Sequence, residues 1–256
     1  MKAAKRLVQR CVRSLGYDIV PFPPSDYVRS RDSVRRVLDK LSIDCVVDVG
    51  ANHGQYGSWL RDIGYKGWIV SFEPVRAPFE DLERCAAARP PWRAFQYALG
   101  SENGQAEINV NVHDVLTSFL LPIVTETLPW SKVAGRETVE VRRLDSILDE
   151  SLGGIPSPRL YLKLDTQGFD LEALRGADGV LANFLAAQTE ISFVPLYEGM
   201  PNWIDSLKEF QSRGFSVVDF MPVTRVAGDL LMMEMDCILA RDFKPSSDPD
   251  AKAGCA

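Results

Sequence analysis

The segment that most constrains this chain is residues 45–55, because it combines a strand, a glycine loop and the start of a helix. Residues 45–49 are apolar apart from one aspartate, as in a buried strand. Gly50 and Gly54 interrupt that run, and apolar residues return at three- and four-residue steps over 56–63, which predicts a helix. A strand, a glycine loop and a helix in this order bring backbone N–H groups close to a polar ligand. An ordinary turn between a strand and a helix is the alternative.

The rest of the chain alternates apolar runs with helical patterns in the same way. We expect strands at 45–49, 68–72, 93–98, 106–112, 138–141, 160–164, 184–193, 215–220 and 233–240. We expect further helices at 33–41, 77–88, 144–148, 171–175 and 203–213. Strands that alternate with helices form a mostly parallel sheet with helices on both faces. The last two strands have no helix between them, so they predict a C-terminal antiparallel hairpin.

The expected domain organisation is one α/β domain at 31–242 between two short attachments. Residues 1–30 carry five positive charges before the first acid, an apolar stripe at helical spacing and a Pro-rich linker. This basic helix either lies on an anionic membrane surface or packs on the domain, and both remain open. Residues 113–137 lack periodicity and predict an irregular loop that covers an acceptor. Residues 243–256 are polar and predict a disordered tail.

Composition excludes several classes of protein. The net charge of −6 argues against a nucleic-acid partner, which would require a basic surface. The five cysteines are scattered and none forms a CxxC pair, which favours a reducing, cytoplasmic setting, with membrane association through the N-terminal helix left open. With two histidines and no cysteine cluster, a zinc site is not expected. A small-molecule or glycolipid partner fits this composition. Assembly of the chain into a homo-oligomer is also possible on this composition.

Polar residues at the predicted strand ends point to a nucleoside cofactor. Glu73 follows the second strand 23 residues after Gly50, where an acid can accept both hydroxyls of an adenosine ribose. NAD and S-adenosylmethionine both carry that ribose. A pyrophosphate seat requires GxGxxG, but here Asn52 stands between Gly50 and Gly54. The ammonium and sulfonium of S-adenosylmethionine prefer carboxylates, which Asp48 and Asp165 supply. S-adenosylmethionine is therefore favoured, and a nicotinamide-dependent oxidoreductase is the alternative.

Several motifs together resemble the FkbM-type methyltransferases, over roughly residues 34–240. The matching segments are DVGANHGQ at 48–55, FEP at 72–74, ALG at 98–100, LKLDTQG at 162–168, LRGA at 174–177 and TEI at 189–191. The resemblance implies a Rossmann-like class I fold with a seven-stranded, mostly parallel sheet. It also implies methylation of a hydroxyl on a sugar, a glycolipid or a polyketide. A methyltransferase fold that serves only as a binding module is the non-enzymatic alternative.

The resemblance also assigns cofactor contacts. The glycine loop would line the methionine part, Glu73 would bind the ribose, and the residues around Tyr97 would flank the adenine. The expected cofactor-binding residues are Asp48, Gly50, Ala51, Asn52, Gly54, Gln55, Glu73, Pro74, Tyr97, Ala98 and Asp165.

Methyl transfer to an alcohol also needs a group that takes the hydroxyl proton. Asp165 ends a predicted strand and is a candidate, although it could instead hold the cofactor's ammonium. Glu190 ends the next strand and could act as a second carboxylate, or bind Mg²⁺ together with Asp165, or simply form an ion pair. His53 in the cofactor loop and His113 at the start of the irregular loop are the remaining candidates.

Overall fold

The computed structural model describes residues 12, 26–123, 132–225 and 231–241. The basic N-terminal helix and the C-terminal tail expected from the sequence lie outside these ranges. None of the described helices combines the length and the apolar character that crossing a bilayer requires.

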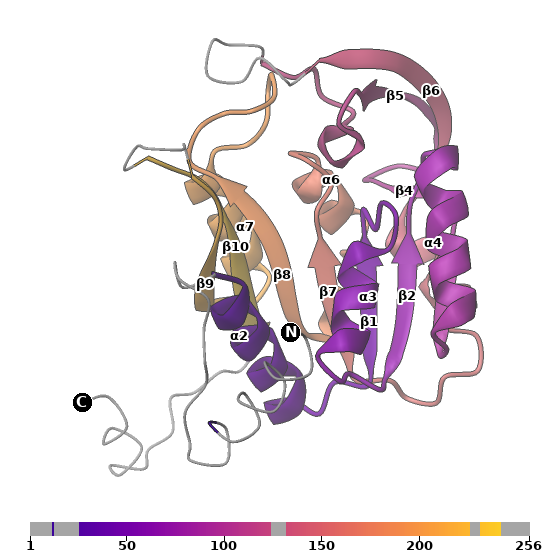
Figure 1. Ribbon diagram of the computed structural model, residues 1–256, viewed down its shortest axis with the longest axis vertical. Coiled ribbons are helices and arrows are strands. Elements are labelled where there is room, and N and C mark those ends of the chain that lie inside the picture. The colour runs from indigo at the N-terminus through magenta and orange to yellow at the C-terminus, as the bar shows by residue number, and fades with distance from the viewer. Residues whose placement is uncertain (1–11, 13–25, 124–131, 226–230, 242–256) are drawn as a thin grey trace.

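A seven-stranded sheet forms the centre of the domain, in the order β3-β2-β1-β7-β8-β10-β9 (Figure 1). Its strands are β1 (Cys45–Val49), β2 (Trp68–Phe72), β3 (Trp92–Phe95), β7 (Leu160–Leu164), β8 (Phe184–Ser192), β9 (Phe215–Arg225) and β10 (Met232–Arg241). β10 runs antiparallel to both of its neighbours, and the other pairs are parallel. β1 and β7 are buried along their whole length, which explains their continuous apolar runs. The predicted fold, including the terminal antiparallel hairpin, is confirmed.

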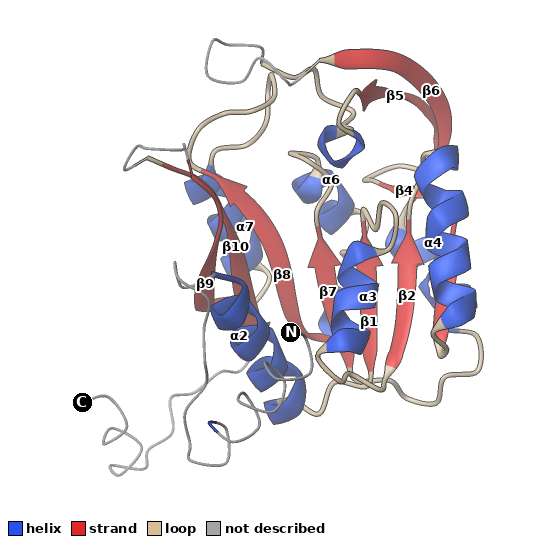
Figure 2. Ribbon diagram, in the orientation of Figure 1, coloured by secondary structure: helices blue, strands red, loops and turns tan. Residues whose placement is uncertain are grey.

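Helices cover both faces of this sheet (Figure 2). They are α2 (Asp26–Lys40), α3 (Gln55–Asp62), α4 (Arg76–Ala88), α5 (Leu144–Leu152), α6 (Asp170–Arg175) and α7 (Trp203–Ser212), with the short 3-10 turns η1 (Asp114–Leu116) and η2 (Leu181–Asn183). Apolar residues of α2, α3 and α4 share one hydrophobic cluster with Tyr161 of β7. Residues of α5, α6 and α7 share a second cluster with Leu162. Neighbouring residues of one strand therefore point into two different cores, as the pleat requires.

A second, three-stranded sheet was not predicted. It consists of β4 (Ala98–Leu99), β6 (Val133–Arg142) and β5 (Gly104–Asn111), in that order. The single strand predicted at 93–98 is wrong, because the exposed Gln96 separates β3 from β4. Figure 1 shows β5 and β6 beyond the carboxyl ends of β1 and β2. The small sheet therefore adds a wall at the edge where a ligand is expected.

Two predicted boundaries also differ from the structure. β6 begins at Val133, so the irregular segment is shorter than the expected 113–137. The first half of β6 is largely exposed, and it therefore lacks the apolar alternation that identifies a strand. α2 begins at Asp26, seven residues before the expected start at Ser33.

Candidate active site

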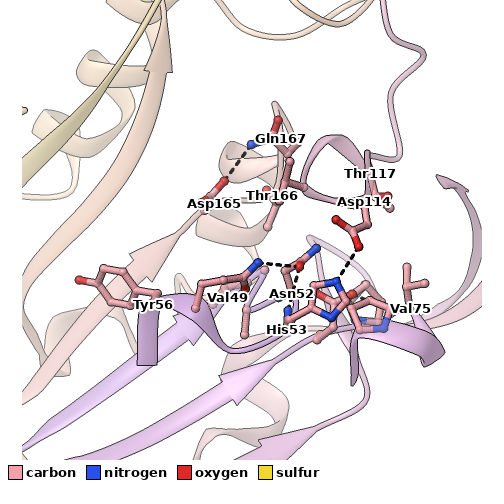
Figure 3. A pocket seen from close by; sticks show the side chains of 18 of the residues that line it. Val49, Asn52, His53, Tyr56, Val75, Asp114, Thr117, Asp165, Thr166 and Gln167 are labelled. Atoms are coloured by element: carbon pink, nitrogen blue, oxygen red, sulfur yellow. Dashed lines mark hydrogen bonds and ion pairs between the residues drawn. The ribbon is translucent and has the colours of Figure 1, made fainter. Parts of the chain in front are cut away.

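A cavity of about 560 Å³ lies at the carboxyl ends of the parallel strands (Figure 3). Its lining comes from the glycine loop, α3, the segments after β2 and β7, β4, η1, β8 and β10. The expected cofactor residues that line it are Gly50, Ala51, Asn52, Gln55, Glu73, Pro74, Tyr97, Ala98 and Asp165. Residues far apart in the sequence thus meet in one cavity, at the edge where open α/β sheets bind ligands.

The glycine loop has a geometry that explains its residues. Gly50 has φ +76°, and a Cβ there would lie 1.9 Å from the backbone oxygen of Asp165. Asn52 adopts φ +46°, a left-handed conformation that Asn tolerates better than most residues. Gly54 also has a positive φ and is the N-cap residue of α3. The loop therefore packs directly against the end of β7, which only a residue without a side chain permits at position 50.

Glu73 connects the end of β2 to the glycine loop. The backbone N–H of Asn52 donates to its Oε2 at 2.8 Å, and that of Val75 donates to its Oε1 at 2.9 Å. Burial raises the pKa of Glu73 to about 7, against the effect of these two hydrogen bonds. The carboxylate also lines the cavity, next to Pro74 and close to Tyr97.

This end of the cavity fits the adenosine part of S-adenosylmethionine. Glu73 offers acceptor oxygens for the ribose hydroxyls, and the sides of Val75, Tyr97 and Ala98 offer a mainly apolar slot for a planar base. The carboxylate of Asp165 lines the same cavity and suits an ammonium or a sulfonium group.

Asp48 lies beneath the cavity and does not line it. Its side chain is fully buried, accepts a hydrogen bond from Ser71 Oγ at 3.1 Å, and lies 3.4 Å from Lys163 Nζ. The sequence predicted that Asp48 contacts the cofactor directly. In the structure Asp48 instead lies under Lys163 and supports that side chain.

Lys163, in the middle of β7, is a cavity residue that the sequence analysis missed. Its ammonium contacts Asp165 Oδ2 at 3.1 Å and lies 5.1 Å from the ring centre of Tyr56. Burial disfavours the ammonium, but Asp165 and Asp48 outweigh that effect and raise its pKa. A charged residue inside an otherwise apolar strand was the available signal, since lysine is almost never buried unless paired.

Gln167 joins the two carboxylates proposed as catalytic. Its Nε2 donates to Asp165 Oδ1 at 3.0 Å and to Glu190 Oε2 at 3.1 Å, and its Oε1 accepts from the Tyr197 hydroxyl at 2.8 Å. Asp165 faces the cavity beside Gln167 (Figure 3), whereas Glu190 is not among the lining residues. Burial and the neighbouring Asp165 raise the pKa of Glu190 well above its usual range.

The predicted Mg²⁺ site gains no support from this arrangement. An amide nitrogen, which carries no lone pair for a metal, lies between Asp165 and Glu190. Within the described ranges, no group of three His, Cys, Asp or Glu residues is arranged to hold a metal ion.

The two histidines have different positions. His53 lines the cavity, with Nδ1 2.7 Å from Asp81 Oδ2 on α4 and Nε2 2.6 Å from Asp114 Oδ2 on η1. Each ring nitrogen lies within hydrogen-bonding distance of a carboxylate, so His53 links three segments and both nitrogens are already engaged by the protein. His113 is exposed and does not line the cavity. The structure therefore supports neither histidine as the base.

The far end of the cavity is formed by residues that the sequence analysis did not select. The hydroxyls of Tyr56 and Tyr161 donate to Gln188 Oε1 at 2.8 and 3.0 Å. Asp236, on β10, lines the cavity beside Gln188. Burial, followed in size by the charge of Asp165, raises the pKa of Asp236 to about 7, although a hydrogen bond with Gln188 lowers that pKa. Acidic residues within a largely buried terminal strand were the only sequence signal for this position.

The sheet order, the glycine loop and the buried carboxylate after β2 define a Rossmann-like protein whose cavity is suited to a nucleoside. Residues 48–217 match the family model described as the methyltransferase FkbM domain, which is more than half of the chain. The chain belongs to this family. The resemblance noted in the sequence is thereby confirmed.

Two curated relatives are also methyltransferases by name. Methyltransferase 1 of Beauveria bassiana (strain ARSEF 2860) is 24% identical over 174 residues, 63% of this chain and 62% of the relative. Methyltransferase sdnD of Sordaria araneosa is 29% identical over 155 residues, 52% of this chain and 60% of the relative. The chain thus spans less than two thirds of either relative.

Solved structures with similar folds include further methyltransferases. A TehB-like SAM-dependent methyltransferase from Corynebacterium glutamicum has a TM-score of 0.39 and 12% identity, covering 94% of this chain and 96% of that one. Aeropyrum pernix fibrillarin, in complex with natively bound S-adenosyl-L-methionine, has a TM-score of 0.43 and 12% identity, covering 77% of this chain and 66% of that one.

Proposed function

We propose that this protein transfers a methyl group from S-adenosylmethionine to a hydroxyl group, on a sugar of a glycolipid or of a glycosylated natural product. The observation that carries the proposal is that one cavity contains both a carboxylate suited to a ribose, Glu73, and a separate polar and aromatic end near Tyr56 and Asp236. Family membership supports the methyltransferase chemistry.

The donor would occupy the part of the cavity between Glu73 and Asp165. S-adenosylmethionine supplies a methyl group on a sulfonium, which is already a good leaving group. The protein has then mainly to orient donor and acceptor in line and to exclude water. The packed glycine loop and the position of Lys163 between Asp48 and Asp165 hold this region in a fixed geometry.

The other end of the cavity suits a hydroxylated ring. Tyr56 and Trp59 pack with their ring centres 5.4 Å apart, and both line the cavity. Aromatic faces stack well on the apolar faces of sugars, and Gln188 and Asp236 offer polar atoms for hydroxyl groups. A polyketide or another small hydroxylated molecule is the second acceptor class that these residues would accommodate.

Calorimetry with S-adenosylhomocysteine tests the donor site. We expect the wild-type protein to bind it and Glu73→Ala to lose most of the affinity, because the ribose hydroxyls lose their acceptor. Glu80→Ala is a matched control, since Glu80 is an exposed carboxylate on α4 that pairs with Arg76. Absence of binding, or equal binding by Glu73→Ala, would refute the cofactor assignment.

The acceptor class is tested by incubation with S-adenosylmethionine and two sets of sugars. Methyl glycosides represent free sugars, and long-chain alkyl glycosides represent glycolipids. Mass spectrometry should show a product that has gained one methylene unit. Methylation of neither set, in the presence of a donor that binds, would exclude simple glycosyl hydroxyls.

Membrane contact through residues 1–20 is a separate proposal, motivated by their basic and apolar pattern. Co-sedimentation with vesicles rich in an anionic phospholipid should be stronger for the intact chain than for one that lacks these residues. Equal sedimentation would exclude this segment as the anchor.

A further inference from the structure

We propose that Asp236 is the general base of the methyl transfer, the group that receives the proton of the acceptor's hydroxyl. The assignment rests on the proposed function. It concerns a residue on β10, the antiparallel strand of the sheet, which none of the sequence motifs includes.

Asp236 lies at the end of the cavity opposite Glu73. Glu73 follows β2, and Asp236 lies on β10; β1, β7 and β8 lie between these strands. Four strand spacings correspond to about 19 Å across the sheet. A donor whose ribose is held at Glu73 and whose methionine part lies over the glycine loop occupies the β2-β1-β7 end. The wall formed by β8 and β10 is then left for the acceptor, and Asp236 is the carboxylate on that wall that lines the cavity.

The other carboxylates that line the cavity are engaged by neighbouring groups of the protein. Glu73 accepts two backbone N–H groups, Asp114 pairs with His53, and Asp165 is held by Lys163 and Gln167. In Glu73 and in Asp165, each of the two carboxylate oxygens already accepts a hydrogen bond from the protein. The hydrogen bond described for Asp236 comes from the amide of Gln188, and the charge of Lys163 also favours its ionised form.

The protein fixes the orientation of Gln188. Its amide oxygen accepts from the hydroxyls of both Tyr56 and Tyr161, so the amide nitrogen is the group that faces Asp236. Gln188 is itself buried, which prevents it from rotating freely. It is therefore a positioning residue that holds the Asp236 carboxylate toward the cavity.

The protonation of Asp236 also suits this role. Burial, with a further contribution from Asp165, brings its pKa to about 7. A general base is most effective when its pKa lies near the working pH. The charged or titratable groups on the surrounding elements are Tyr56, Tyr161, Lys163, Asp165, Asp170, Asp219, Glu190 and Glu234.

An oxygen lone pair of the acceptor forms the new bond to the methyl carbon while the carbon–sulfur bond breaks and its electron pair remains on sulfur. The O–H bond of the acceptor gives its proton to the Asp236 carboxylate, and the resulting carboxylic acid then releases that proton to solvent.

The test uses two nucleosides that need no acceptor. S-adenosylhomocysteine lacks the transferable methyl group, whereas sinefungin carries an ammonium group near the position of that methyl. A carboxylate beside the transfer position should bind this ammonium. By calorimetry at pH 8, we expect wild type to prefer sinefungin, and Asp236→Asn to weaken sinefungin binding roughly tenfold to a hundredfold. The affinity of Asp236→Asn for S-adenosylhomocysteine should differ from that of wild type by less than about twofold, which corresponds to less than about 0.5 kcal/mol of binding free energy.

Glu234→Gln is the matched control, because Glu234 is a buried carboxylate on the same strand as Asp236 but lies outside the cavity lining. It should leave the preference for sinefungin intact. Circular dichroism checks the fold of Asp236→Asn, and Asp236→Ser provides a second variant without a carboxylate.

Three results would overturn the assignment. The preference for sinefungin could survive in both Asp236 variants, or it could disappear in Glu234→Gln, and either result would place the base elsewhere. Failure of wild type to bind either nucleoside would refute the proposed function and this assignment together. If S-adenosylhomocysteine binds normally but the Asp236 variants keep the preference for sinefungin, only the assignment of Asp236 is refuted.

Discussion

The hydroxyl of Tyr56 donates a hydrogen bond to the amide oxygen of Gln188 at 2.8 Å, although the two residues are 132 positions apart in the sequence. Tyr56 belongs to α3, directly after the glycine loop, and Gln188 belongs to β8 at the far end of the cavity. The contact therefore connects the helix that follows the glycine loop to a strand at the far end of the cavity. It lies in the interior, where a hydrogen bond is costly to leave incomplete.

Tyr56→Phe should destabilise the protein by about 1 kcal/mol, because the buried Gln188 oxygen loses one of its two phenolic donors. Urea denaturation measures the change. Tyr65→Phe is a suitable control, since the Tyr65 hydroxyl makes only a long 3.4 Å contact with the Trp68 oxygen. Equal stability losses in the two variants would show that the Tyr56–Gln188 bond is unimportant.

Gly50→Ala should abolish binding of S-adenosylhomocysteine and lower the melting temperature sharply. A methyl group at this position would collide with the Asp165 backbone oxygen, in addition to the strain of a left-handed alanine. Gly64→Ala separates the two effects. Gly64 also has a positive φ, but a Cβ there would meet nothing within 4 Å, so only the strain of roughly 1–2 kcal/mol remains. If Gly64→Ala were as damaging as Gly50→Ala, the collision would not be the cause.

Asp114→Ala should accelerate the release of S-adenosylhomocysteine several-fold. It removes the contact between η1 and His53 of the glycine loop, where the two segments meet over the cavity. Both side chains are partly exposed, so the effect on stability should stay below about 1 kcal/mol. Stopped-flow fluorescence can follow release, because Trp59 lines the cavity.

Asp81→Ala is the matched control for that experiment. It removes the carboxylate on the other side of His53, on α4, and leaves the contact with η1 in place. A similar acceleration in both variants would mean that η1 does not retain the ligand.

Asp236→Asn should become more stable relative to wild type as the pH rises. Burial raises the pKa of Asp236 from 3.8 to about 7, so the folded state holds the proton more tightly than the unfolded state. The resulting stabilisation of wild type is complete below about pH 4 and is lost as the pH rises through 7. In Asp236→Asn, residue 236 does not titrate and contributes no such pH dependence to stability. Urea midpoints at pH 5.5 and pH 8 measure the difference. Parallel pH dependences for wild type and Asp236→Asn would contradict a raised pKa at this site.

The sequence by itself determined the fold and the donor end of the cavity. Apolar runs that alternate with helical patterns predict a parallel sheet, and the order of residues 48–55 predicts a glycine loop at its edge. Glu73 was found because it follows a strand at a recognisable distance from that loop. These signals are local, since each depends on residues that are close together in the chain.

Only the tertiary structure decided the acceptor end. Lys163, Gln188 and Asp236 lie on three strands whose adjacency the sequence does not encode locally, and their side chains meet because the strand order places β7, β8 and β10 side by side. The same packing placed Asp48 beneath the cavity and occupied both nitrogens of His53, although each residue lies in the glycine-loop segment. Whether a polar side chain is free to react depends on its neighbours in space, and strand pairing brings those neighbours from distant parts of the chain.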